Sequence, residues 1–218
     1  MMNDINTRRE TPGRREGSSG VDFGTIGAGT VAQAIAAHLA AAGNQVTISN
    51  SRGPETLREV AARLGPSVSA GTVEQAASAD MVFLAVRWPE VREALSGLPA
   101  WSGRILVDTT NVLPNAPALE ELGVETASEF VADLAPGARV VKAFNTLYAE
   151  YIAADPRHAQ GRQLLFYAGD DASAKDDFRA VAERIGFAAV DAGPLREGGR
   201  LMQVGGGVLS ALHALKQD

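Results

Sequence analysis

A glycine motif near the amino terminus carries the clearest chemistry in the sequence. It reads Gly27-Ala28-Gly29-Thr30-Val31-Ala32 and stands between a short apolar segment and an alanine-rich segment. In such a G-x-G-x-x-A pattern the first glycine permits a tight turn and the second lets the backbone approach phosphate oxygens, while the small third residue lets a helix pack closely on a strand. The free N–H groups at the start of that helix face an anion. The motif therefore predicts a site for the pyrophosphate of a dinucleotide.

The residues about 20 positions beyond the glycines indicate which dinucleotide binds, because an NAD site usually carries Asp or Glu there. This chain has Ser49-Asn50-Ser51-Arg52 instead. Short polar side chains and a guanidinium hold a 2′-phosphate through charge-assisted hydrogen bonds, whereas a carboxylate would repel it. We therefore expect NADP(H), with Asn50, Ser51 and Arg52 at the phosphate. The alternative is that Arg52 is an ordinary solvated loop residue.

Hydrophobic patterning predicts the elements that must hold these residues in place. A strand at 23–26 leads into a helix at 31–42 that Gly43 ends, and a second strand follows at 45–49. Strands and helices continue to alternate, which predicts an α/β fold with a mostly parallel sheet and one domain over residues 21–218. The other expected strands lie at 68–70, 81–86, 103–107, 139–144 and 164–168, and the other expected helices lie at 55–64, after Thr72, after Pro89, after Thr126, at 172–185 and at 198–216.

Polar and small residues follow four of these strands, at 49–52, 85–88, 108–111 and 143–146. Ligands of open parallel sheets bind outside the carboxyl ends of the strands. The four segments are therefore expected to meet at one cofactor cleft. The alternative is that the Asn and Thr residues only begin turns there, as they often do. Beyond the residues named above, the candidates for cofactor binding are Ala85, Val86, Arg87, Asn111, Ala143 and Asn145.

The composition excludes several classes of function. The chain has 218 residues, a formal net charge of −6 at pH 7 and no cysteine, and its three histidines lack metal-ligand spacing. Disulfides, thiolate metal sites and thiol nucleophiles are therefore excluded, and no metal site is expected. The acidic charge argues against a nucleic-acid surface, and no apolar run reaches the length of a membrane span. Residues 1–20 carry almost no apolar side chains and predict a disordered tail. A cytoplasmic location is expected.

The motifs Ile-Gly-Ala-Gly, Asn-Ser-Arg, Leu-Ala-Val-x-Trp, Asp-x-Thr-Asn, Val-Val-Lys-Ala-Phe-Asn-Thr-Leu, Ala-Gly-Asp-Asp and Asp-Ala-Gly-Pro-Leu-Arg follow one another between residues 21 and 215. In this order they resemble the family of coenzyme F420-dependent NADP oxidoreductases, whose relatives include the cytosolic reductase domain of the transmembrane metalloreductases. The resemblance implies a doubly wound Rossmann fold with a small C-terminal extension, commonly in a homodimer. It also implies direct hydride exchange between NADP(H) and F420 or a flavin.

The resemblance also assigns residues to parts of the two ligands. It places Gly27, Ala28 and Gly29 at the pyrophosphate and Ser51 and Arg52 at the 2′-phosphate. Beside the nicotinamide it places Ala85, Val86, Trp88 and Asn145, and the turn Gly193-Pro194-Leu195 forms a wall of the cleft for the second substrate.

No catalytic acid or base is assigned. Hydride transfer between two stacked rings needs close approach and exclusion of water more than it needs a proton donor. Two other functions fit the same cofactor half. One is reduction of a small carbonyl or imine, for which Tyr148, Lys142 or Asp108 would have to supply the proton. The other is a non-catalytic NADP-binding sensor.

Overall fold

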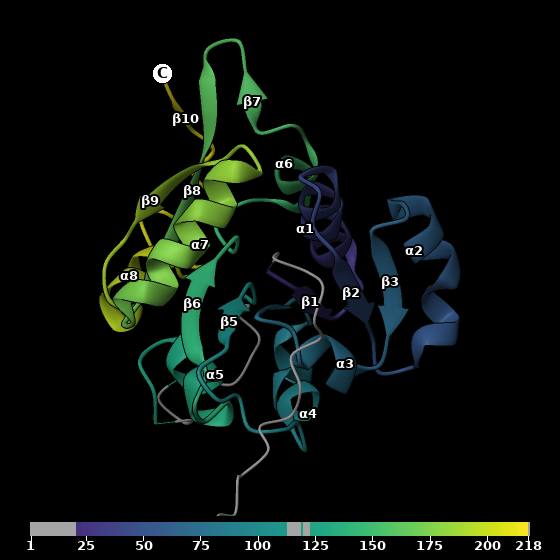
Figure 1. Cartoon of the computed structure of the whole chain (residues 1–218). Helices are drawn as coiled ribbons and strands as arrows, with labels where there is room; N and C mark the ends of the chain where they lie inside the picture. The colour runs from purple at the N-terminus through teal and green to yellow at the C-terminus, as the bar shows by residue number, and fades with distance from the viewer. Residues whose placement is uncertain (1–20, 113–118, 120–122, 218) are drawn as a thin grey trace, which may run out of the picture.

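The structure is a computed structural model that describes residues 21–112, 119 and 123–217, so the tail predicted at residues 1–20 lies outside it. Among the described residues, ten strands form one sheet in the order β10-β8-β6-β5-β4-β1-β2-β3, and β7 and β9 also pair with β8 (Figure 1). The strands are β1 Phe23–Ile26, β2 Val46–Ser49, β3 Val68–Gly71, β4 Met81–Leu84, β5 Ile105–Asp108, β6 Arg139–Ala143, β7 Arg157–His158, β8 Gly161–Gly169, β9 Ala188–Asp191 and β10 Leu215–Lys216.

The six strands from β3 to β6 are all parallel and lie in the order β3-β2-β1-β4-β5-β6. This is the strand order of a doubly wound dinucleotide-binding sheet. The predicted Rossmann-type α/β fold is therefore confirmed. The sheet then continues through β8, which runs antiparallel to β6, and through β9, which runs parallel to β8.

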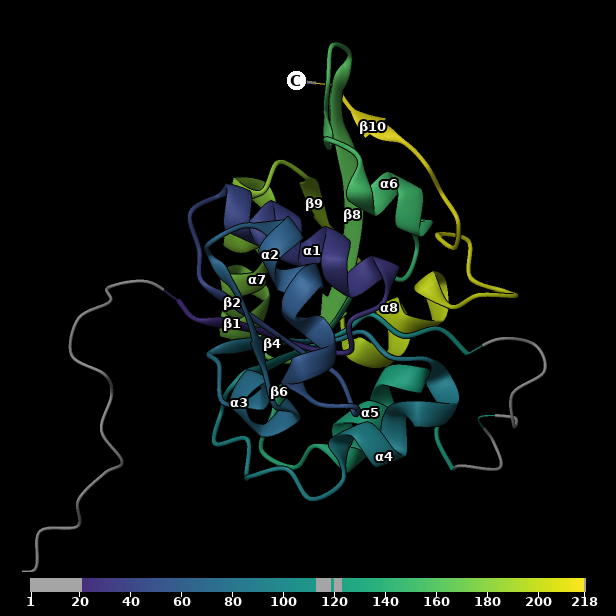
Figure 2. The ribbon, with the colours of Figure 1, turned by 90° about the vertical axis from the view of Figure 1, so that its right-hand side faces the viewer.

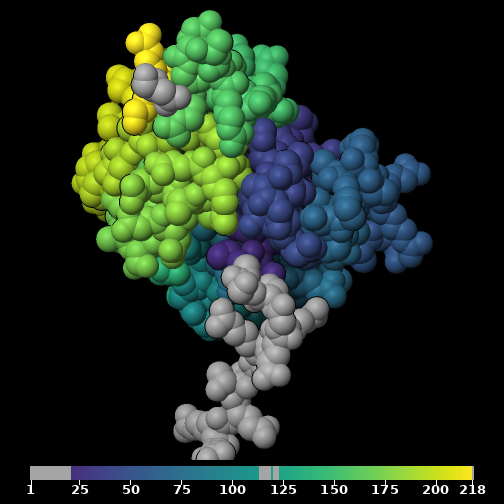
Figure 3. Space-filling model, turned by 45° about the horizontal axis from the view of Figure 1, so that its top comes forward, coloured from purple at the N-terminus to yellow at the C-terminus, as the bar shows by residue number. Residues whose placement is uncertain are grey.

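Helices cover both faces of the sheet because the strands are apolar on both sides. Successive side chains of a strand point to opposite faces, so Met81 and Phe83 pack on one face while Val82 and Leu84 pack on the other. The first face is covered by α1 Thr30–Ala41, α2 Arg58–Leu64, α6 Ala149–Ala153 and α7 Ala172–Arg184, and the second by α3 Val73–Ala77, α4 Val91–Leu95, α5 Ala127–Leu134 and α8 Leu195–Met202 (Figure 2). In Figure 3 the blue surface of α1 and the yellow-green surface of α7 meet without a gap.

An unusual backbone conformation ends β6. Phe144 has a φ of 65°, in the left-handed region that a bulky side chain rarely adopts. The sequence predicted a strand through this residue, but the left-handed turn stops β6 at Ala143. The Phe144 ring is 1% exposed, and its centroid lies 6.1 Å from that of Phe83, 6.1 Å from Phe178 and 5.8 Å from Phe187. This aromatic cluster offsets the backbone strain and sends Asn145 away from the strand direction.

The C-terminal segment differs most from expectation. The helix predicted at 198–216 is instead α8, which begins at Leu195 and ends at Met202. Gly198 and Gly199 are required for packing, because added Cβ atoms would lie 2.5 Å from the Ala168 Cβ and 3.2 Å from the Thr126 Cβ. They are where α8 packs closely on β8 and α5. Turns then lead to β10, and no helix in the described part of the chain is long and apolar enough to cross a membrane.

The other predicted elements are present with small shifts in their ends, whereas α6, β7 and β9 were not predicted. The helices expected after Thr72 and Thr126 are both present, and each begins with a capping box that the side chain of Gln75 or Glu129 completes. The helix expected at 55–64 is divided into a 3-10 turn, η1 Pro54–Leu57, and α2. A second 3-10 turn, η2 Trp88–Glu90, precedes α4. These elements bring the predicted loops to one edge of the sheet.

Candidate functional site

A cleft of about 540 Å³ lies at the carboxyl ends of β1, β2 and β4. Its volume is within the range of small-molecule and cofactor sites. It brings together most of the predicted cofactor residues, which come from the loops after β1, β2 and β4, and the start of α3 and the end of α4 complete its wall. Its lining residues are Ile26, Gly27, Ala28, Gly29, Asn50, Ser51, Val73, Glu74, Ala85, Val86, Arg87, Glu90, Glu93, Ala94, Ser96 and Leu98.

The two glycines of the motif have different reasons for being glycine. Gly27 has a φ of 109°, and a Cβ there would lie 2.2 Å from the carbonyl oxygen of Ala85. It therefore allows the loop after β1 to pass close to the end of β4. Gly29 has an ordinary φ of −73°, and a Cβ there would meet no atom within 4 Å. The space beside Gly29 is therefore open to the cleft. A phosphate needs such open space to approach the backbone closely.

The start of α1 is free to receive an anion. Its N-cap residue is Gly29, which offers no side-chain cap, and its first turn carries no acidic residue. The backbone N–H groups of that turn have no intrahelical acceptor. Gln33 fixes the loop in front of them, since its Nε2 donates to the Ala28 carbonyl at 2.8 Å while its Oε1 accepts from Arg63 at 2.7 Å. Thr30 and Val31 lie in this turn but do not line the cleft.

The loop after β2 is organised by Asn50. Its Oδ1 accepts from the backbone N–H of Arg52 at 2.9 Å, and its Nδ2 donates to the Thr56 hydroxyl at 3.0 Å. Ser51 and Arg52 are exposed, and the Arg52 guanidinium has no hydrogen bond or ion pair with any described residue. An arginine held at its backbone and free at its guanidinium is available for a ligand phosphate.

Arg87, by contrast, already has a partner at the rim of the cleft. Its Nε donates to the Glu90 Oε1 at 3.0 Å, and a second guanidinium nitrogen forms an ion pair with the same oxygen. Hydrogen bonding to Glu90 raises the pKa of Arg87, and the same bond lowers the pKa of Glu90. A carboxyl group with a lowered pKa stays ionised to lower pH, and its pairing is lost only as the pH falls through that pKa. At neutral pH the charge of Arg87 is therefore paired with that of an ionised Glu90.

Replacing Glu90 with Gln should strengthen NADPH binding. The change leaves the Arg87 charge unbalanced beside the cleft, and exposed charges act over about 10 Å at 0.1 M salt. We expect a two- to fivefold lower Kd at low ionic strength, since exposed pairs are worth about 0.2–1 kcal/mol. Isothermal calorimetry at low and high salt checks this. A gain that persists at 1 M salt would contradict the electrostatic explanation.

A buried polar network lies at the ends of β5 and β6. Asp108 is completely buried and accepts four hydrogen bonds, from the Thr110 N–H and hydroxyl, the Ser128 hydroxyl at 2.7 Å and the Lys142 Nζ at 3.0 Å. The carboxylate is therefore saturated. Lys142 also donates to the Thr110 carbonyl at 2.5 Å, and its side chain is 4% exposed.

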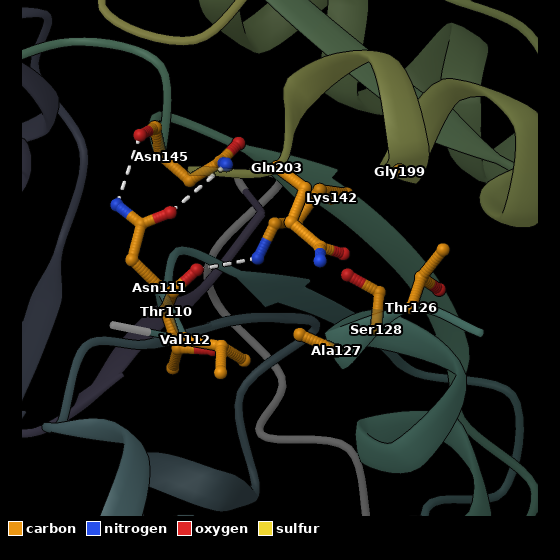
Figure 4. Close-up of a pocket in the computed structure, with 10 residues that line it drawn as sticks. All are labelled: Thr110, Asn111, Val112, Thr126, Ala127, Ser128, Lys142, Asn145, Gly199 and Gln203. Carbon is orange, nitrogen blue, oxygen red and sulfur yellow. Dashed lines mark hydrogen bonds between the residues drawn. The ribbon is translucent and has the colours of Figure 1, made fainter. Parts of the chain in front are cut away.

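Asn111 and Asn145 join this network to α8. The Asn111 Nδ2 donates to the backbone carbonyl of Asn145 at 2.9 Å, and the Asn145 Nδ2 donates to the Asn111 Oδ1 at 3.1 Å and to the Met202 carbonyl at 2.9 Å. Figure 4 shows these side chains around a small pocket. The pocket has room for about one water molecule (10 Å³) and is lined by Thr110, Asn111, Val112, Thr126, Ala127, Ser128, Lys142, Asn145, Gly199 and Gln203.

Several of these lining residues carry no functional signal in the sequence. Thr126 and Ser128 were seen only as part of a helix start, and Gln203 carried no local signal at all. They meet because α5 and α8 pack against each other and against β6. The polar segments at 108–111 and 143–146, which supply Thr110, Asn111 and Asn145, are the part of this lining that the sequence indicated.

Trp88 and Ala143 lie apart from both cavities. The Trp88 side chain is 8% exposed and its ring centroid lies 5.4 Å from that of Phe130 on α5, so the indole packs in the core. Ala143 is fully buried as the last residue of β6. Their contact with a nicotinamide stays a prediction. Tyr148, a candidate proton donor, is 61% exposed at the start of α6.

The turn Gly193-Pro194-Leu195 lies away from the nucleotide cleft, and its contact with a second substrate stays a prediction. Because β8 runs antiparallel to β6, with Val141 opposite Gly169, β8 ends at the edge of the sheet where β6 begins. The Gly169 N–H donates to the Gly193 carbonyl at 3.1 Å, which places the turn at that edge. The nucleotide cleft lies at the opposite edge. It is the other end of α8, at Met202 and Gln203, that reaches the loop after β6.

Comparison with known proteins places the chain among nucleotide-dependent reductases. Residues 22–112 match the family model for NADP oxidoreductases, coenzyme F420-dependent. Metalloreductase STEAP3 of Rattus norvegicus is 30% identical over 174 residues, which are 79% of this chain and 34% of that protein. The chain therefore spans about a third of the length of this curated relative.

Two solved structures share most of the fold. The protein SMa0349 from Sinorhizobium meliloti superposes with a TM-score of 0.84 at 38% identity, over 91% of this chain and 97% of that one. A candidate F420-dependent NADP reductase from Arthrobacter sp. FB24 superposes with a TM-score of 0.67 at 28% identity, over 81% of this chain and 86% of that one.

Proposed function

The chain belongs to the family of coenzyme F420-dependent NADP oxidoreductases, and from this premise we propose that it transfers a hydride between NADP(H) and F420 or a flavin-like acceptor. The observation that supports binding of NADP(H) is the cleft between the loops after β1, β2 and β4. It joins the open space at Gly29 to the loop of Arg52, whose guanidinium has no partner among the described residues. No carboxylate stands at the end of β2 to take the place of the 2′-phosphate.

The strand order supports a direction for the bound nucleotide. Neighbouring strands are about 4.8 Å apart, and the edge of the sheet runs from β2 through β1, β4 and β5 to β6. With the 2′-phosphate at β2 and the pyrophosphate at β1, the nicotinamide extends toward the ends of β4 and β5. The pocket at Asn111 and Asn145 follows directly beyond it. The acceptor ring is therefore proposed to stack between the nicotinamide and the loop after β6.

Arg52→Ala tests the choice of cofactor. The loss of a charged hydrogen-bonding group should cost about 1.5–3 kcal/mol of NADPH affinity, and NADH affinity should hardly change. Calorimetry with both cofactors measures this difference. Arg58→Ala is the matched control, because Arg58 is an exposed arginine nearby that pairs with Glu55. Equal losses for NADPH and NADH in Arg52→Ala would show that Arg52 does not recognise the phosphate.

The acceptor is tested by stopped-flow absorbance with NADPH and, separately, F420, FMN, FAD and a panel of small carbonyls and imines. Oxidation of NADPH by F420 or a flavin supports the proposal. Turnover only with carbonyls or imines would move the protein to that class of reductase. No turnover with any acceptor would favour a sensor of NADP. The homodimer and the cytoplasmic location stay predictions.

A further inference from the structure

A chain of two hydrogen bonds ties α2 to the glycine loop, across the contact between α2 and α1. The Arg63 guanidinium donates to the Gln33 Oε1 at 2.7 Å, and the Gln33 Nε2 donates to the Ala28 carbonyl at 2.8 Å. The direction of the chain is fixed, because a guanidinium only donates and a backbone carbonyl only accepts. The Gln33 amide therefore has one orientation in which both of its ends have partners.

The carbonyl at the end of this chain belongs to a peptide that lines the cleft. Ala28 stands between Gly27 and Gly29, and all three residues line the cleft. The Ala28 carbonyl and the Gly29 N–H lie in one peptide plane and point in opposite directions. Half a turn of this peptide would exchange the two groups. The turn would change the φ of Gly29 from its value of −73°, and glycine adopts φ of either sign at little cost. The hydrogen bond from Gln33 selects one of the two orientations.

We propose that Gln33 and Arg63 are positioning residues for the cofactor pyrophosphate. Gln33 holds the Ala28 carbonyl oxygen away from the phosphates, and Arg63 holds the Gln33 amide in the orientation that does so. The inference rests on the proposed function, in which NADP(H) occupies this cleft. A carbonyl oxygen turned toward a phosphate repels it, whereas a backbone N–H in the same place donates to it. Neither Gln33 nor Arg63 lines the cleft, so both act through Ala28.

A direct attraction between the Arg63 charge and the phosphates is the alternative. In the part of the chain that the structure describes, no acidic residue pairs with Arg63. The two explanations differ in two measurable properties. Direct attraction is screened by salt, since charges in 1 M salt act over only about 3 Å, and it does not need Gln33. An effect that passes through the hydrogen bonds persists in salt and disappears once Gln33 is replaced.

Three variants test the proposal: Gln33→Leu, Arg63→Ala and the double variant. Isothermal calorimetry measures their affinities for NADPH and NADH at low salt and at 1 M salt. Gln33→Leu should lose about tenfold for both nucleotides, which share the pyrophosphate, and Arg63→Ala should lose about threefold for both. The double variant should lose no more than Gln33→Leu does, and each factor relative to the wild type should be the same at both salt concentrations. Arg58→Ala, which changes an exposed arginine of the same helix that pairs with Glu55, should bind as the wild type does.

The outcomes separate this inference from the function on which it rests. Unchanged affinity in a folded Gln33→Leu protein would overturn the inference and leave the function standing. So would a loss in Arg63→Ala that is confined to NADPH, which would assign the guanidinium to the 2′-phosphate. Losses that multiply to about thirtyfold in the double variant, or that vanish at 1 M salt, would overturn it in favour of direct attraction. Failure of the wild-type protein to bind either nucleotide would overturn the proposed function and the inference together. Thermal unfolding of each variant verifies that it is folded.

Discussion

Gly29→Val should lose at least about 100-fold in affinity for both NADPH and NADH, a change of about 2.8 kcal/mol. The valine side chain would occupy the open space beside the first turn of α1, where the pyrophosphate is proposed to lie. The fold should survive, because Gly29 has φ −73° and ψ −174°, an extended conformation that valine adopts readily, and no atom lies within 4 Å of the added Cβ. Only the weaker helix cap costs stability, by about 1 kcal/mol.

Two companion variants sharpen this test. Gly29→Ala, with a smaller side chain, should give an intermediate loss for both nucleotides. Ala41→Val adds comparable bulk at the exposed last residue of the same helix and should bind as the wild type does. Calorimetry gives the affinities and circular dichroism verifies the fold. Undiminished binding by a folded Gly29→Val protein would remove the pyrophosphate from this loop.

Lys142→Met should lower the free energy of unfolding by about 3–5 kcal/mol, the cost of leaving a buried charge without its partner. Asp108 is fully buried and would keep its three hydrogen bonds from Thr110 and Ser128, but no cation would balance it. Urea unfolding followed by fluorescence measures the change. Adding Asp108→Asn in the same chain removes the unpaired charge and should recover most of the loss.

Lys175→Met is the matched control for that substitution. Lys175 pairs with Asp191 at 2.9 Å, nearly the same distance as the 3.0 Å between Lys142 and Asp108. The Asp191 side chain is 42% exposed, however, and water solvates it when the lysine is removed. A loss below about 1 kcal/mol is expected there. Equal losses in the two variants would mean that burial does not set the strength of the Lys142 pair.

The residues that line the cleft after β1 and β2 could be predicted from the sequence because their signals are local. Gly27, Gly29 and the residues after β2 lie within one strand-helix-strand unit, and parallel pairing carries them to one edge by a general rule. The capping boxes at Thr72 and Thr126 are local in the same way. In each case the residues that set the local backbone geometry lie within a few positions of the loop or helix start that depends on it.

The surroundings of the pocket at the ends of β5 and β6 could not be predicted in this way. The direction of β8 decides which edge receives the Gly193 turn, and nothing in the sequence of that turn reports the direction. Gln203 reaches the pocket because Gly198 and Gly199 let α8 pack closely on β8 and α5, a contact that the sequence of this segment does not indicate. Trp88 follows a strand end as a ligand-contacting aromatic would, but the ring is drawn into the core by Phe130. Long-range packing thus determines what the local pattern leaves open.

The left-handed conformation of Phe144 makes the geometry of the pocket depend on packing in the hydrophobic core. A left-handed conformation costs about 1–2 kcal/mol for a residue with a side chain, and here the surrounding rings of Phe83, Phe178 and Phe187 offset it. The next residue is Asn145, so the course of the chain into the pocket is chosen by aromatic packing on the opposite face of the sheet. Substitutions in that cluster, although they touch no ligand, would redirect the backbone that presents the amide. Changes in acceptor preference along this family should therefore be sought among these core aromatics as well as among residues that line the pocket.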